Sequence, residues 1–102
     1  MKRLVIAEPA VRDLEEIVDY LVLDDPGAAE RVYRGIVRVA ERLPVFPALG
    51  RPGRQPETRE MSVPGLPYLI VYEAGPEAVT VIAVFHTSRD LARALRDRME
   101  GD

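Results

Sequence analysis

Two apolar stripes joined by a short link constrain the fold of this chain more than any other feature. The first stripe recurs at helical spacing after Pro9, which suits the start of a helix because proline has no N–H to leave unpaired there. The first helix is expected to end near Asp24. Asp25-Pro26 then predicts a second helix, with aspartate as its cap and proline at its first position, and Pro44 ends it. The stripes consist of Val11, Leu14, Val18, Leu21 and Val22, and of Ala29, Val32, Ile36, Val39, Ala40 and Leu43.

Strand-like segments flank these two helices, whose short connection predicts an antiparallel hairpin. Arg3 to Ala7 indicates a short strand, and Pro44 to Glu57 indicates a loop because it is rich in proline and glycine. Asp90 to Met99 has the spacing of a short C-terminal helix. Three further strands are predicted at Thr58 to Val63, Pro67 to Glu73 and Ala78 to His86, paired antiparallel across short turns. The last two of these strands are apolar at both odd and even positions, so they should lie in the centre of the sheet with both faces covered.

These elements predict one α+β domain over residues 1–102, in the order β-α-α-β-β-β with a short C-terminal helix. The helical hairpin is expected to pack on a small antiparallel sheet. No apolar run approaches the roughly 18 residues of a membrane span, and Glu8-Pro9 end the N-terminal apolar run too early for a signal peptide. The chain has no cysteine, which removes disulfides and thiolate metal sites. A soluble protein that stays in the cytoplasm, without contact to membranes, is therefore expected.

Few residues suit the catalysis of a small-molecule reaction. His86 is the only histidine and stands where the last strand ends. It is either a general acid or base, or a residue that closes the strand by hydrogen bonding. With one histidine and no cysteine, neither a metal nor another cofactor is expected. Ser62 and Ser88 lie outside any nucleophile-elbow pattern.

The arginines form two sets that suit an anionic partner. Arg51, Arg54 and Arg59 are close in sequence and are joined by Arg89 after the last strand. Strand pairing is expected to bring Arg59 and His86 to one region of the sheet, where a groove would attract nucleic acid or an acidic peptide. The second set lies on one edge of the second helix and is either a solvated face with ion pairs to the first helix or a docking ridge. Its members are Arg31, Arg34, Arg38 and Arg42. The first helix is expected to carry the acids Asp13, Glu16 and Asp19 on its outer side.

Several segments together resemble the RelE/ParE superfamily, the toxins of bacterial type II toxin–antitoxin systems. The resemblance spans almost the whole chain in the family's order. It implies a helical hairpin on an antiparallel sheet, and a cognate antitoxin that forms a hetero-oligomer with the toxin. The antitoxin's tail would lie on apolar grooves beside the helices and sheet, at residues that the sequence does not identify. The matching segments are Glu8 to Ile17, Tyr20-Leu21, Asp25 to Ala29, Phe46 to Arg54, Thr58-Arg59-Glu60, Pro67 to Tyr72 and His86 to Asp90.

Two activities occur among these relatives: RelE-like members cut mRNA in the ribosome, and ParE-like members inhibit DNA gyrase. The net charge of −3 opposes binding to ribosomal RNA. The Gly50 to Arg54 loop and the Thr58-Arg59-Glu60 segment are more similar to the ParE side. The resemblance therefore implies a non-enzymatic toxin that inhibits gyrase. Its expected target contacts are Arg51, Arg54, Arg59, His86 and Arg89.

Two alternatives remain open from the sequence. In a ribosome-dependent mRNA endonuclease, Glu60 or His86 would move protons while Arg59 and Arg89 hold the phosphate as negative charge builds. In a decayed toxin, only binding to the antitoxin would persist.

Overall fold

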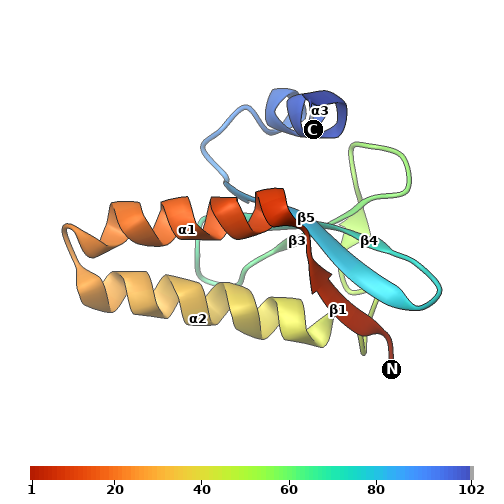
Figure 1. Ribbon diagram of the computed structural model, residues 1–102, viewed down its shortest axis with the longest axis horizontal. Coiled ribbons are helices and arrows are strands. Elements are labelled where there is room, and N and C mark those ends of the chain that lie inside the picture. The colour runs from red at the N-terminus through yellow and green to blue at the C-terminus, as the bar shows by residue number, and fades with distance from the viewer. Residues whose placement is uncertain (102) are drawn as a thin grey trace.

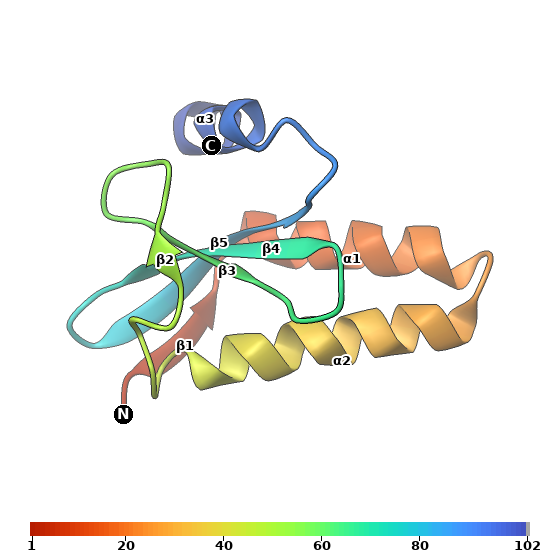
Figure 2. The same ribbon diagram turned by 180° about the vertical axis from the view of Figure 1, so that it is seen from behind.

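The computed structural model describes residues 1–101 and arranges them as a mixed sheet with helices on both faces (Figures 1 and 2). The predicted α+β class and the predicted order of elements are confirmed. No helix within the described residues is long and apolar enough to cross a membrane. The elements are β1 (Arg3–Ile6), α1 (Glu8–Val22), α2 (Pro26–Arg42), β2 (Arg51–Pro52), β3 (Arg59–Ser62), β4 (Tyr68–Ala74), β5 (Ala78–His86) and α3 (Leu91–Gly101).

The helices α1 and α2 form the predicted hairpin, and local signals set their ends. Asp25 caps α2, because its Oδ1 accepts a hydrogen bond from the Ala28 N–H at 3.1 Å. Pro26 occupies the first turn, and α2 ends at Arg42, shortly before Pro44. Figure 1 shows the tip of the hairpin extending beyond the strands, away from both chain termini.

The sheet has five strands in the order β1-β5-β4-β3-β2, with β5 and β4 inside it as expected. It differs from the predicted antiparallel sheet at its two edges. β1 pairs parallel to β5, with Arg3 opposite Ala78 and Ile6 opposite Val81. This pairing joins strands far apart in the chain, so no short turn fixes their direction. At the other edge, the two-residue β2 forms within the segment expected to be a loop and pairs with β3.

Each face of the sheet carries its own apolar core, which explains why β4 and β5 are apolar on both parities. On one face, α1 and α2 pack over alternate residues of these strands, including Tyr68, Ile70 and Tyr72. On the other face, α3 covers the intervening residues. Figure 2 shows α3 on the side of the sheet away from α2. The second core consists of Leu69, Val71, Ala83, Phe85, Ala94 and Leu95.

Candidate functional site

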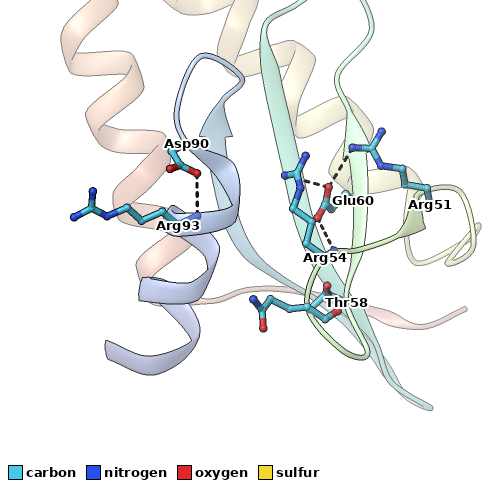
Figure 3. A network of polar contacts seen from close by, with 7 residues as sticks. Arg51, Arg54, Thr58, Glu60, Asp90 and Arg93 are labelled. Carbon is cyan, nitrogen blue, oxygen red and sulfur yellow. Dashed lines mark hydrogen bonds and ion pairs between the residues drawn. The ribbon is translucent and has the colours of Figure 1, made fainter.

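Glu60 is the centre of a polar cluster at the β2–β3 edge of the sheet (Figure 3). Its side chain is 1% exposed, and Arg51 lies opposite it in the strand pairing. Glu60 Oε2 accepts a hydrogen bond from the Arg54 backbone N–H at 2.9 Å. Glu60 Oε1 lies 3.2 Å from Arg51 Nη2 and 3.5 Å from Arg54 Nη1. Because a buried carboxylate is costly without such partners, the three residues form one unit.

Arg59 lies next to Glu60 in β3 but belongs to the other face of the sheet. It pairs with Tyr72, whose side chain lies in the core beneath the hairpin. Arg59 Nη1 donates a hydrogen bond to the Gly50 carbonyl at 2.7 Å. The Tyr72 hydroxyl accepts from the Gly50 N–H and donates to the Pro47 carbonyl, both at 2.8 Å. Arg59 therefore helps to fasten the loop between α2 and β2 to the sheet.

His86 is part of a different group, at the end of β5. Its ring meets the Tyr68 ring edge-on, with the centroids 5.2 Å apart. His86 Nδ1 accepts a hydrogen bond from the Ser88 N–H at 3.1 Å, so the neutral ring carries its proton on Nε2. The Arg89 guanidinium packs over the Phe85 ring, 4.7 Å from its centroid. This geometry fits the interpretation of His86 as a residue that closes the strand.

The strand register separates the predicted contact residues. Arg59 pairs with Tyr72, and His86 pairs with Tyr68. These two β4 positions are about 13 Å apart at roughly 3.3 Å per residue. The expected meeting of Arg59 and His86 in one region is therefore wrong. The structure brings together Arg51 and Arg54 at one place, and His86 and Arg89 at another.

A hollow of about 340 Å³ lies between the end of β5 and α1. Tyr20, Tyr68, His86, Glu16 and Arg89 all contribute to its lining. Burial raises the pKa of the Tyr68 hydroxyl above its ordinary value, and Tyr20 raises it further. At neutral pH this hydroxyl stays protonated, so it offers a neutral hydrogen bond and no basic group. Among residues 1–101, no group of three or more histidine, aspartate or glutamate side chains is placed to hold a metal ion.

The arginine row on α2 is exposed to solvent, and Arg34 forms an ion pair within the helix. Arg34 Nη2 lies 2.7 Å from Glu30 Oε1, one turn earlier. Arg42 packs its guanidinium over the Phe46 ring, 5.9 Å from the centroid. An exposed pair of this kind contributes little to stability. These contacts favour the interpretation of the arginine row as a solvated face. The Arg34 ion pair lies within α2, whereas the expected ion pairs joined α2 to α1.

Asp13 differs from its predicted place on the outer face of α1. Its side chain is only 11% exposed, because it pairs with Arg98 of α3. The spacing in the sequence indicates this inward position, since Asp13 follows Ala10 by three residues and precedes Ile17 by four. It therefore lies beside the inward stripe. The partner in α3 was not predictable from that spacing.

An apolar groove of about 550 Å³ runs between α1, α2 and the edge strand β1, and the sequence did not identify its residues. It remains open because Ala10 is the only fully buried residue of α1. Glu15, Asp19 and Glu41 stand among the lining residues and give the groove an acidic character. Its apolar lining includes Leu4, Ile6, Val11, Leu14, Val18, Tyr33 and Val37.

Known proteins resemble this chain in sequence and in fold. The family described as "ParE toxin of type II toxin-antitoxin system, parDE" matches residues 4–91. "Putative toxin Y4kP" of Sinorhizobium fredii is 38% identical over 86 residues, which cover 84% of this chain and 88% of the relative.

Two solved structures share the fold. The chromosomal ParDE system from P. aeruginosa matches with a TM-score of 0.76 at 21% identity, over 84% of this chain and 96% of that chain. The isolated E. coli RelE toxin matches with a TM-score of 0.54 at 20% identity, over 97% of this chain and 99% of that chain.

Proposed function

The chain belongs to the ParE toxin family of type II toxin–antitoxin systems, and we propose that it inhibits DNA gyrase in the cytoplasm until a cognate antitoxin binds it. Gyrase is the target implied by the resemblance to ParE-like toxins. The proposed mode of action is binding rather than catalysis. The burial and pairing of Glu60 is the observation that carries this choice.

A ribosome-dependent nuclease needs a free proton acceptor beside the phosphate that it cleaves. Both oxygens of Glu60 already have partners, and its side chain is 1% exposed. His86 Nδ1 is occupied by the Ser88 N–H. The net charge of −3 also opposes long-range attraction to RNA. These features support a toxin that acts by binding a protein target.

Arg51 and Arg54 are the best candidates for contact with that target. Their side chains are 60% and 38% exposed, and both guanidinium groups approach one carboxylate. Arg59 is engaged with the Gly50 carbonyl, whereas His86 and Arg89 lie at the other end of the sheet. A target that used all five predicted residues would have to span the sheet.

The groove between α1, α2 and β1 suits the antitoxin that toxins of this family pair with. Its lining is apolar, and Glu15, Asp19 and Glu41 add negative charge. An amphipathic segment could place apolar side chains in the groove and basic side chains against these carboxylates. We therefore propose that the antitoxin's tail binds here in a hetero-oligomer.

Gyrase inhibition is tested directly with purified toxin and purified gyrase in a DNA supercoiling assay. We expect loss of supercoiling and accumulation of cleaved DNA, both reversed by the antitoxin. Arg51→Gln should weaken inhibition, whereas Arg31→Gln on α2 should leave it unchanged as a control of equal charge.

Expression of the chain without its antitoxin adds a second readout. DNA breaks with continued early protein synthesis support the proposal. Codon-specific mRNA cuts with normal supercoiling would contradict gyrase inhibition and support the mRNA endonuclease. Normal growth together with tight antitoxin binding would leave only a binding module.

A further inference from the structure

We propose that Arg51 and Arg54, held side by side by the buried Glu60, form a receptor for a single carboxylate group of a protein segment. In this receptor the two arginines bind the ligand, and Glu60 is a positioning residue that does not touch it. The inference rests on the proposed role of the two arginines as target contacts, and it adds the chemistry that they recognise.

Glu60 holds two like charges at one place. Arg51 Nη2 and Arg54 Nη1 both lie within 3.5 Å of the same oxygen, Glu60 Oε1 (Figure 3). Two guanidinium groups repel each other, and without an anion between them they would separate in solvent. The buried carboxylate offsets this repulsion before any ligand arrives. The ligand therefore meets a site whose charges are already in place.

The loop that carries Arg54 is also fixed in shape. The Gly53 N–H donates to the Thr58 carbonyl at 2.8 Å, and the Thr58 hydroxyl donates to the Gln55 carbonyl at 2.7 Å. A Cβ on Gly53 would lie 2.3 Å from Thr58 Oγ1, so only glycine fits this turn. The backbone N–H of Arg54 is itself bound to Glu60 Oε2. The backbone that carries Arg54 therefore has little conformational freedom left to lose on binding.

The two guanidinium groups retain capacity for a second anion. Each guanidinium has five N–H donors, and the contacts with Glu60 Oε1 join one nitrogen of Arg51 and one of Arg54. The exposed fractions of 60% and 38% leave both groups accessible from solvent. Two arginines and one glutamate leave a surplus of one positive charge. That surplus matches one carboxylate, which can bind a guanidinium through two parallel hydrogen bonds.

A protein carboxylate fits this cluster better than a nucleic-acid backbone. Nucleic-acid binding gains its strength from many phosphate contacts and from a basic surplus. This chain carries a net charge of −3, with 17 acidic residues against 14 lysines and arginines. A protein segment can present one carboxylate among neutral residues, so it avoids most of that repulsion.

The test is a titration of the purified chain with a glutamate-containing peptide and, separately, with a single-stranded oligonucleotide of equal charge. Signals of the Arg51 and Arg54 side-chain N–H groups in nuclear magnetic resonance spectra report binding. We expect the peptide to shift these signals and to bind more tightly than the oligonucleotide. Equal or tighter oligonucleotide binding would overturn the assignment to a carboxylate.

The variant Glu60→Gln separates positioning from general electrostatics. It removes one negative charge, so simple attraction predicts tighter peptide binding. Loss of positioning predicts binding about ten-fold weaker, because each guanidinium loses its charged partner. Glu57→Gln, an exposed neighbour with the same change in charge, should not weaken binding. Unchanged or tighter binding by folded Glu60→Gln would overturn the proposal.

A second variant covers the case in which Glu60→Gln does not fold. Arg51→Lys with Arg54→Lys keeps both charges but removes the planar donor pairs, and we expect a similar loss of peptide affinity. Full affinity in this variant would overturn the receptor. Because these titrations contain no gyrase, a chain that binds the peptide but leaves supercoiling intact would disprove the proposed target alone.

Discussion

The carboxylate of Asp13 in α1 and the guanidinium of Arg98 in α3 meet across the free edge of β5. Arg98 Nη2 lies 2.8 Å from Asp13 Oδ1, and Arg98 Nη1 lies 2.9 Å from Asp13 Oδ2. β1 pairs with β5 only as far as Val81. Beyond it, Arg98 Nη1 donates to the Ile82 carbonyl at 2.8 Å, and the Val84 N–H donates to Asp13 Oδ2 at 2.9 Å. The two side chains thus take the place of β1 in the hydrogen bonding along this part of β5. They also join α1 to α3, which lie on opposite faces of the sheet.

Asp13→Asn is expected to destabilise the fold by about 1–3 kcal/mol, because it replaces the largely buried carboxylate that accepts two hydrogen bonds from Arg98 with a neutral amide, which has only one acceptor oxygen. Chemical denaturation measures the change. Glu8→Gln is the matched control, because Glu8 also pairs with an arginine but its side chain is 84% exposed. It should change stability little. Equal effects of the two variants would show that the Asp13–Arg98 pair is no stronger than a surface pair.

The sequence predicts most of the fold because its signals are local. The cap at Asp25, the proline at the start of α2 and the apolar runs of the last two strands all act over a few residues. The parallel pairing of β1 with β5 depends on residues more than seventy positions apart, from Arg3 to Ala78. No turn between neighbouring strands encodes that pairing.

The candidate site was less predictable, because it depends on register. Glu60 and Arg59 are neighbours in sequence but face opposite sides of the sheet. One becomes buried between two arginines, and the other fastens a loop through the Gly50 carbonyl. A bulge that leaves Ile82 unpaired also shifts β5 along β4, which no pattern of apolar residues announces.

Gly50→Ala should disturb the loop that leads into the arginine cluster. An added Cβ would lie 2.8 Å from the Glu60 carbonyl oxygen and 2.8 Å from the Tyr72 hydroxyl. We expect a loss of about 1–3 kcal/mol of stability from overpacking, measured by thermal or chemical denaturation. Gly27→Ala in the first turn of α2 meets only side-chain ends at 3.4 Å and should be stabilising by about 0.5–1 kcal/mol. The prediction fails if both substitutions act in the same direction.

The raised pKa of Tyr68 predicts a loss of stability at alkaline pH. The unfolded chain releases this proton at its ordinary pKa near 10, whereas the folded chain retains it to higher pH. The contribution of Tyr68 is therefore fully present below pH 10 and declines as the pH rises toward the folded-state pKa. The measurement compares the unfolding free energies of the natural chain and Tyr68→Phe from roughly pH 8 to 11. We expect the natural chain to lose stability relative to the variant, and a constant difference would contradict this.

Val11→Glu should release the toxin from its antitoxin. Val11 lines the apolar groove and is 39% exposed, so the substitution is compatible with folding. A carboxylate there must lose its water when the apolar side chains of the antitoxin enter the groove. We expect antitoxin affinity to fall at least about ten-fold by calorimetry, with growth inhibition persisting when the antitoxin is co-expressed. Val22→Glu, 43% exposed and outside the lining of the groove, should bind normally. Equal affinity of both variants for the antitoxin would place the antitoxin elsewhere on the toxin.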